Sequence, residues 1–396
     1  MHFVLIFSVT LLIAVLFSAL AERSVLSTAV IFLAAGLLAG PAGMGWLRLY
    51  PGERGVEILV NLAMFTVLFT DGMGVHLGRL IRGWRLPGRA LFIGLPLTFL
   101  LTGLAARWLL HLPWTECFLL GAVLSPTDPV LASAIIGNEE VPRRVRGLLN
   151  VESGMNDGLA LPLVVVLLAV DRLQPVQGWH VVFEVAVGGL LGIAIPWLAV
   201  RLEALPWFAA SAPYQPLNTF AVGLIVLSLA QLIGVNLFLA GFAAGITLGA
   251  VGPDFRDAFA PLGELIAELF KLAALLVVGA LLPLSVFLHT PLLQWIFVLL
   301  VLLVVRTVAI EFSLLGSALD WRERVTVAWF GPKGFASILF GMLILREGTQ
   351  HAILLFHLVA LVVAASVIAH SSTDVVFARW FGRREEQKES ESQRAA

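Results

Sequence analysis

The sequence is poor in charge. Only 13% of its 396 residues are Asp, Glu, Lys or Arg, whereas 59% are hydrophobic and the mean hydropathy is +0.96. Soluble domains carry about 25% charged residues, so this composition indicates a polytopic membrane protein. The net charge of −1 leaves no excess of basic groups, which argues against nucleic acid as a partner.

Cysteine is scarce, and long polar loops are missing. Cys117 is the single cysteine, so the chain cannot form an intramolecular disulfide and its fold must rest on helix packing. The first apolar stretch, residues 3–20, lacks the basic residues that open a signal peptide, and we interpret it as a retained first helix. No soluble domain interrupts the apolar stretches, and the polar, charged tail at residues 381–396 is predicted to be disordered.

The apolar stretches predict an all-α membrane protein, because a helix needs about 20 apolar residues to cross a bilayer. Reading the chain in this way gives about thirteen spans, approximately at residues 3–20, 25–45, 56–75, 90–106, 115–137, 147–170, 180–200, 217–233, 236–251, 262–283, 292–316, 325–345 and 351–370. The boundary between the eighth and ninth spans depends only on Gly234 and Val235.

The basic residues predict the orientation. With the N-terminus outside, seventeen of them fall in inside loops and the tail and five in outside loops. Such an asymmetry is typical of proteins in the cell membrane, and it predicts a cytoplasmic C-terminus. The cluster Arg79, Arg82, Arg85 and Arg89 is interpreted as a cytoplasmic anchor to anionic lipid.

Two of the predicted spans are interrupted. The fifth contains Pro126 and Pro129 around Asp128, and the twelfth contains the string GPKG, in which Lys333 follows a proline. Proline removes a backbone donor and clashes with the preceding turn, so both helices should break. Because the two spans enter from opposite sides, they predict inverted repeats with two crossed discontinuous helices, the arrangement that marks the ion site of a secondary transporter.

The sixth span opens with charge. Glu152 and Asn156 share one helix face, and Ser153 and Asp157 share another about 100° away. A carboxylate near the bilayer centre costs about 2.5–3.5 kcal/mol, so it needs a partner or a function. We interpret Asp157 as the carrier of ion and proton, and Glu152 as a structural counter-charge.

Two cations within spans are available to Glu152. They are Arg306 and Lys333, and we favour Arg306 because guanidinium binds carboxylate bidentately. Lys333 is then left to offset helix dipoles at the break or to modulate the site. Asp71 is read either as a helix cap or as a second modulator.

Other ionisable groups have plainer interpretations. Glu264, Glu268 and Lys271 are spaced for mutual pairing along the tenth span. His357 and His370 lie in the last span, where packing or an interfacial position is favoured over pH sensing.

Several of these strings resemble one family. TDPV at Thr127–Val130 and ESGMNDG at Glu152–Gly158, together with LFTDGMGVHLGRLIRGWR at Leu68–Arg85, resemble the monovalent cation/proton antiporters in their sodium/proton exchanger branch. The resemblance covers about residues 1–380. It implies a core bundle at about 90–170 and 292–370, and a scaffold bundle at about 1–89 and 180–290 that mediates a homodimer.

The resemblance also implies roles for single residues. Asp157 would bind cation and proton, with Asn156 beside it in the Asn-Asp signature of electroneutral exchangers. Thr127, Asp128 and Ser153 would build the ion site or support its broken helix, and Arg306 would pair with Glu152. GPKG departs from the Gly-Leu-Arg-Gly string of many relatives, and the match at Asp71 is loose.

The expected function is therefore exchange of Na⁺ for H⁺ by alternating access, one for one. The ligands would be oxygens of Asp157, Ser153 and Thr127, because hard cations prefer oxygen, and no cofactor is expected. A K⁺/H⁺ exchanger, an electrogenic stoichiometry and, more remotely, an intramembrane hydrolase remain alternatives. Since the sequence offers no Ser/His or metal-ligand cluster, we do not expect an enzyme.

Overall fold

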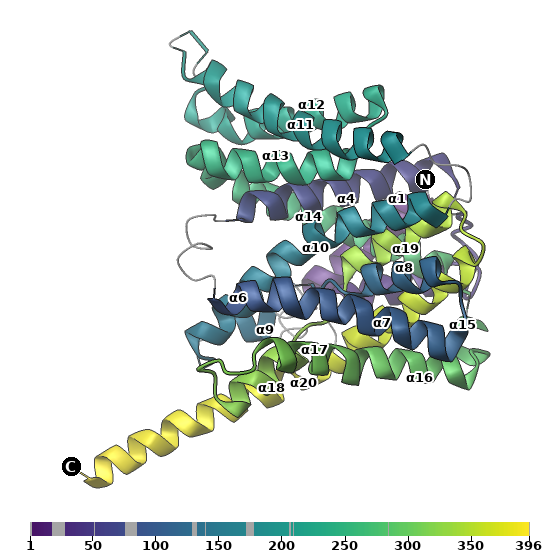
Figure 1. Cartoon of the computed structure of the whole chain (residues 1–396). Helices are drawn as coiled ribbons and strands as arrows, with labels where there is room; N and C mark the ends of the chain where they lie inside the picture. The colour runs from purple at the N-terminus through teal and green to yellow at the C-terminus, as the bar shows by residue number, and fades with distance from the viewer. Residues whose placement is uncertain are drawn as a thin grey trace.

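The computed structural model describes residues 2–17, 28–50, 52–75, 85–128, 133–138, 140–171, 178–205, 207–208, 210–283 and 285–395. Throughout these residues the regular structure is helical, as the sequence predicts, and most long helices run in one general direction (Figure 1). Residues 79 and 82 of the predicted lipid anchor, and Pro129 and Val130 of the TDPV string, lie outside the described ranges.

The helices of the first part of the chain are α1 (His2–Leu16), α3 (Thr28–Ala39), α4 (Arg54–Gly74), α6 (Arg85–Arg89), the π-helical turn η1 (Ala90–Gly94), α7 (Leu95–Leu110), α8 (Trp114–Leu124), α9 (Ser133–Ile136) and α10 (Arg143–Asp171). Those of the remainder are α11 (Gly178–Glu203), the 3₁₀ turn η3 (Ala212–Tyr214), α12 (Gln215–Ile233), α13 (Leu237–Val251), α14 (Pro253–Leu281), α15 (Ser285–Leu288), α16 (Leu292–Leu300), the π-helical turn η4 (Val301–Val305), α17 (Arg306–Ser313), α18 (Trp321–Trp329), α19 (Phe335–Glu347) and α20 (Ala352–Ala395).

Each of the predicted spans contains helix. Seven helical stretches in the described residues are long and apolar enough to cross a membrane, and four shorter apolar helices accompany them. The fifth predicted span divides into α8 and α9, and the twelfth divides into α18 and α19. The two interruptions therefore lie where proline and glycine predict them.

The boundary between α12 and α13 is set by local chemistry. Gly234 follows α12 with a φ of 76°, a left-handed conformation that glycine adopts without steric cost. The Asn236 side chain then accepts a hydrogen bond from the Leu239 N–H at 2.8 Å and caps the start of α13. These two residues let successive helices reverse direction across a short connection.

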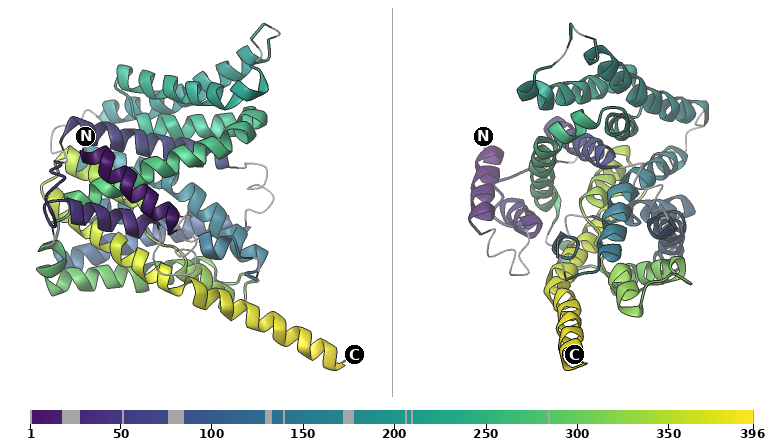
Figure 2. Two further views of the ribbon diagram at one scale, coloured as in Figure 1. Left: turned by 180° about the vertical axis from the view of Figure 1, so that it is seen from behind. Right: turned by 90° about the vertical axis from the view of Figure 1, so that its left-hand side faces the viewer.

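The helices pack mainly within two groups. In one, α13 packs on α4 and α11, and α14 packs on α3 and α4; in the other, α7 packs on α8, α8 on α10, and α19 on α20. Figures 1 and 2 show α11, α12 and α13 on one side of the molecule and α7, α16 and α17 on the opposite side. The helix α10 also contacts α4 and α13, so it lies between the groups.

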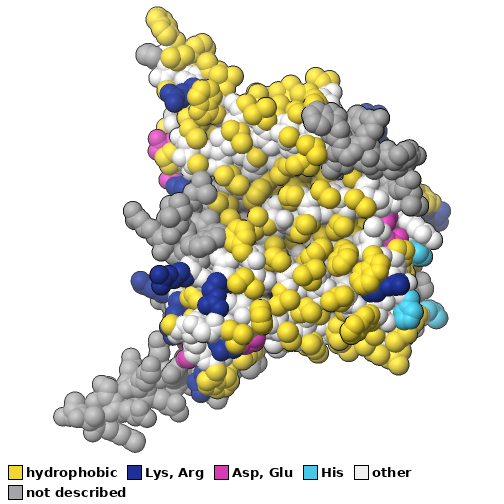
Figure 3. Space-filling model, viewed as in Figure 1, with side chains coloured by type: hydrophobic (Ala, Val, Ile, Leu, Met, Phe, Trp, Pro, Cys, Tyr) yellow, Lys and Arg dark blue, Asp and Glu magenta, His cyan; other side chains and the backbone are white. Residues whose placement is uncertain are grey.

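The surface suits a bilayer. Hydrophobic side chains cover most of the face seen in Figure 3, while Lys and Arg gather mainly along the edge from which the C-terminal helix leaves. Many large apolar side chains are exposed on the helices, for example Leu190 on α11 and Leu299 on α16. Exposure of this extent requires lipid or another apolar partner, so the protein is integral to the membrane.

The end of the chain differs from the sequence expectation. Residues 381–395, predicted to be a disordered tail, continue α20 as helix, and this helix projects from the bundle in Figure 1. The stretch is rich in Arg, Glu, Gln and Lys, which have high helix propensity. A helix already formed in the last span can therefore propagate without the cost of a new nucleus.

Candidate functional site

The two helix interruptions meet and satisfy each other. The Asp128 backbone N–H donates to the Pro332 carbonyl at 2.9 Å, and the Phe335 N–H donates to Asp128 Oδ2 at 3.0 Å. In the other direction, Lys333 Nζ donates to the carbonyls of Ser125 at 3.1 Å and Pro126 at 3.3 Å. Each interruption thus supplies partners for backbone groups that the other leaves without an intrahelical bond.

The charges at this crossing oppose the helix dipoles. Asp128 receives the N–H of the first residue of α19, where a helix carries partial positive charge, and Lys333 contacts carbonyls just beyond the end of α8, where the partial charge is negative. Lys333 is only 1% exposed. The ammonium group is therefore accommodated by carbonyl oxygens rather than by water.

Two glycines of GPKG allow this close approach. A Cβ on Gly331 would overlap the Arg306 guanidinium, and a Cβ on Gly334 would overlap the Asp128 side chain. Any other residue at either position would displace one of these charged groups. The glycines therefore contribute space at the crossing.

Polar side chains in the middle of α10 contact the first interruption. Thr127 Oγ1 lies 3.0 Å from Ser153 Oγ and accepts a hydrogen bond from Asn156 Nδ2 at 2.6 Å. All three side chains are buried. The three polar residues that the sequence nominates beside Asp157 therefore form one connected cluster.

Asp157 lies next to this cluster and is 6% exposed. Among the described residues its Oδ1 has no hydrogen-bond partner, and neither does Asn156 Oδ1. The charged groups that act on the Asp157 carboxylate come from four elements: Asp71 on α4, Asp128 and Lys333 at the two interruptions, and Lys271 on α14. A buried carboxylate oxygen without a donor is costly, so the site is suited to receive a proton or a cation.

Glu152 forms a separate pair. Arg306 NH1 lies 2.8 Å from Glu152 Oε1 and NH2 lies 3.2 Å from Oε2, a bidentate geometry with both residues 3% exposed. Of the two cations that the sequence offered, Arg306 is thus the one bound to Glu152. The π-helical turn η4 directly precedes Arg306. Turns of this kind often occur at functional sites, and no sequence motif predicts this one.

Asp71 and α14 complete the surroundings. Asp71 lies in the last turn of α4, and the Val75 N–H that follows this helix donates to the Gly72 carbonyl at 3.2 Å. Lys271 is acted on by Asp128, Asp71, Glu268 and Asp157, so its charge partners extend beyond its own helix. The described residues hold no group of three or more His, Cys, Asp or Glu arranged for a metal.

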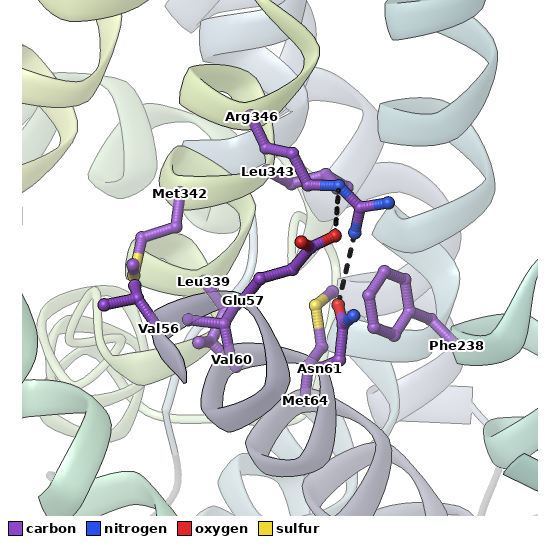
Figure 4. Close-up of a pocket in the computed structure, with 10 residues that line it drawn as sticks. All are labelled: Val56, Glu57, Val60, Asn61, Met64, Phe238, Leu339, Met342, Leu343 and Arg346. Atoms are coloured by element: carbon purple, nitrogen blue, oxygen red, sulfur yellow. Dashed lines mark hydrogen bonds and ion pairs between the residues drawn. The ribbon is translucent and has the colours of Figure 1, made fainter. Parts of the chain in front are cut away.

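Two hollows open near the Arg346 end of the molecule. One is lined by residues of α4, α13 and α19, and Figure 4 shows Arg346 reaching across it toward Glu57 and Asn61. Arg346 Nε lies 3.3 Å from Glu57 Oε1, and its NH1 donates to Asn61 Oδ1 at 3.3 Å. The second hollow, between α10, α11, α13 and α19, shares Phe238, Leu343 and Arg346 with the first.

Comparison with known proteins gives consistent matches. The sequence model of the transmembrane sodium/hydrogen exchanger family matches residues 8–380. The K(+)/H(+) antiporter NhaP2 of Shewanella baltica (strain OS223) is 27% identical over 385 residues, which are 95% of this chain and 66% of that protein. The K(+)/H(+) antiporter NhaP of Alkalimonas amylolytica is 25% identical over 384 residues, with the same coverage of 95% and 66%. The chain thus spans 66% of the length of these curated relatives.

The solved structures give the same fold. The sodium proton antiporter MjNhaP1 from Methanocaldococcus jannaschii, solved at pH 8, matches with a TM-score of 0.68 and 18% identity. The match covers 96% of this chain and 99% of that chain.

The close approach of Arg306 to Gly331 can be tested through the thermal stability of a variant protein. We expect Gly331→Ala to displace the Arg306 guanidinium and weaken its pair with Glu152; breaking a buried pair costs about 3–5 kcal/mol. Thermal unfolding of the purified protein in detergent should therefore begin at a clearly lower temperature. Gly147→Ala on α10, where a Cβ meets open space, is the matched control and should unfold like the wild type. Equal melting temperatures for the two variants would contradict the assignment.

Proposed function

This chain belongs to the sodium/hydrogen exchanger family, and on that premise we propose that it exchanges a monovalent cation for H⁺ across the cell membrane by alternating access. Members of the family are transporters, so the function is transport and not an enzymatic reaction. The proposed cation is Na⁺, and the proposed carrier of both ions is Asp157.

One observation carries the proposal: a buried carboxylate with a free oxygen lies beside the crossing of two broken helices. Burial disfavours the charged form, so Asp157 needs either a proton or a metal ion. Only one of them can satisfy a single carboxylate at a time. Competition at one site, exposed in turn to each side, then exchanges one ion for the other.

The neighbours of Asp157 have the chemistry of a site for a hard cation. Hydroxyl oxygens of Thr127 and Ser153 and the free amide oxygen of Asn156 lie in one cluster. Oxygen ligands are what hard cations prefer. Asp128 has a structural role, because one carboxylate oxygen already accepts the first N–H of α19.

The pair of Glu152 and Arg306 supports a one-to-one exchange. Both charges are neutralised within the protein by two hydrogen bonds, so neither is free to carry an ion. Asn156 is neutral, which leaves Asp157 as the one ion carrier on this stretch of α10. A site that carries either one H⁺ or one Na⁺ moves no net charge in a full cycle.

Potassium is the second candidate substrate. The curated relatives are named K(+)/H(+) antiporters, whereas the structural neighbour is named a sodium proton antiporter. A K⁺/H⁺ exchange would use the same carboxylate and the same competition with H⁺.

Alternating access requires the two packing groups to move relative to each other. We take the core as about residues 90–170 and 292–370 and the scaffold as about 1–89 and 180–290, with the N-terminus outside, the C-terminus cytoplasmic and the scaffold forming a homodimer. In this division Arg346 belongs to the core, while Glu57 and Asn61 belong to the scaffold. Their ion pair and hydrogen bond would therefore hold the Arg346 face closed.

The central test removes the carrier. Asp157→Asn keeps the shape of the side chain but cannot alternate between a carboxylate and its protonated form. In everted vesicles loaded with a pH-sensitive dye, dequenching on addition of Na⁺, Li⁺ or K⁺ should be lost. Asp254→Asn, at an exposed position on α14, is the control and should retain exchange. Wild-type dequenching by Asp157→Asn would remove this residue from the mechanism.

The stoichiometry can be tested separately. In proteoliposomes with an imposed membrane voltage, a one-to-one exchange should run at the same initial rate as without voltage. Measuring the rate with Na⁺, Li⁺ and K⁺ in turn also identifies the preferred cation. A rate that follows the voltage would replace the electroneutral cycle with an electrogenic one.

The contact of Arg346 with Glu57 predicts a change of access. In a Cys117→Ala background carrying Met64→Cys in the lining of the hollow, we expect Glu57→Gln to open the face and raise the rate of modification by a membrane-impermeant maleimide several-fold. An exposed pair is worth about 0.2–1 kcal/mol, which matches an effect of this size. Glu53→Gln, one turn earlier and exposed, is the control. Unchanged labelling in Glu57→Gln would show that the contact does not close this face.

A further inference from the structure

A polar stripe on α20 contacts the second helix interruption. Ser366, His370 and Thr373 are spaced by four and three residues, so they lie on one face of α20. The sequence interpretation of His370 was packing or an interfacial position. In the structure this side chain is 3% exposed, which agrees with packing, and it is hydrogen-bonded on both sides of its ring.

The stripe holds both ends of the interruption. Thr373 Oγ1 accepts a hydrogen bond from the Trp329 indole N–H at 2.9 Å, and His370 Nε2 lies 2.9 Å from the Trp329 carbonyl. Four residues later, the Lys333 backbone N–H donates to Ser366 Oγ at 2.7 Å. Trp329 is the last residue of α18, so α20 provides partners for the last carbonyl before the break and for an N–H within it.

These contacts lead to the proposed ion site. Lys333 is held at its backbone by Ser366, and its ammonium donates to the carbonyls of Ser125 and Pro126. The next residue, Thr127, contacts both Ser153 and Asn156. A displacement of the Lys333 backbone moves its side chain and, with it, the Pro126 carbonyl that the ammonium contacts. The peptide between Pro126 and Thr127 then passes the displacement to the Thr127 hydroxyl.

We propose that Ser366 and His370 are positioning residues for the cation site. They fix the backbone of the α18–α19 interruption and thereby keep the cation ligands in place. This inference deepens the proposed exchange of a cation for H⁺ and rests on it. Neither residue contacts the ion ligands directly. Their effect is to keep the Lys333 ammonium on the two carbonyls that precede Thr127.

The ring of His370 can make these contacts in two ways. Nδ1 lies 2.7 Å from the Ser366 carbonyl and Nε2 lies 2.9 Å from the Trp329 carbonyl. Carbonyls only accept, so both contacts are hydrogen bonds only when both nitrogens carry a hydrogen, as in the imidazolium form. In a neutral ring with the hydrogen on Nε2, Nδ1 can instead accept from the Ser366 hydroxyl at 3.2 Å.

The protonation state of His370 thus changes the hydrogen bonds of Ser366, the residue that holds Lys333. The charged groups that act on the ring are Arg306 and Lys333, and the charge of Arg306 is offset by its pair with Glu152. The rings of Trp329 and Phe330 cover it at centroid distances of 5.1 Å and 6.3 Å. We therefore expect cation affinity to respond to pH partly through this residue.

The test uses full-length protein in proteoliposomes, with initial rates measured against cation concentration. Ser366→Ala removes the acceptor for the Lys333 N–H, and the apparent KM for the transported cation should rise about fivefold, the size of one neutral hydrogen bond. Ser366→Thr keeps a hydroxyl and should return the KM toward the wild-type value. His357→Gln, near the start of the same helix, is the control and should behave as wild type.

His370→Gln retains a hydrogen-bond donor but cannot titrate. The KM of the wild type should change between about pH 5 and pH 8, the range in which histidine changes its charge, and that change should be smaller in His370→Gln. A wild-type KM in Ser366→Ala, or an unaltered pH profile in His370→Gln, would overturn the proposal.

Melting temperatures separate positioning from folding. If Ser366→Ala unfolds at a lower temperature and transports less per folded molecule at an unchanged KM, the stripe is merely structural and the proposal is wrong. If the wild type and His357→Gln exchange no alkali cation at all, the proposed function itself fails.

Discussion

Every backbone polar group in the interior of this protein must find a partner inside the protein, because the hydrocarbon around it offers none. A continuous helix meets that requirement by itself, but two of these helices are interrupted at membrane depth. The requirement is met where they cross: the Asp128 carboxylate accepts an N–H of the opposite helix, and the Lys333 ammonium donates to carbonyls of the first. These helices can thus be interrupted at membrane depth only because TDPV and GPKG each carry a charged residue.

Most of the buried charged residues at this crossing are already bound within the protein, and Asp157 is the exception. Glu152 is bound by both terminal nitrogens of Arg306, and Asp128 and Lys333 satisfy the helix ends. Asp157 differs because one of its oxygens has no donor among the described residues. A site that binds ions reversibly needs such a difference, since a fully satisfied carboxylate would have nothing to gain from a cation. The chemistry of exchange therefore depends on the surrounding charges being already neutralised.

The sequence predicted the features that depend on local chemistry. Proline and glycine located both interruptions, and apolar length located the spans, because these signals act within a few residues. It favoured Arg306 over Lys333 as the partner of Glu152 but did not establish the pair, since Arg306 is 154 residues away and only the packed fold brings the two together. The contacts of Ser366 and His370 were missed for the same reason. The turn η4 and the continuation of α20 through residues 381–395 also lacked a signal: the π-helical turn has no distinct composition, and the charged tail is equally typical of a disordered segment and of a solvent-exposed helix.

Asp128 and Lys333 each bond the opposite interruption, and this has a mechanical consequence. Because Asp128 and Lys333 bond the two interruptions to each other, the end of α8 and the start of α19 are tied at one point, and Gly331 and Gly334 leave no spare volume there. A deformation inside the crossing would expose several buried polar groups at once, at a cost of about 1–3 kcal/mol for each. The half-helices should therefore travel as a rigid body, with any hinge located in the connections that lead away from it. The ion would then be carried by a moving block whose internal geometry stays constant.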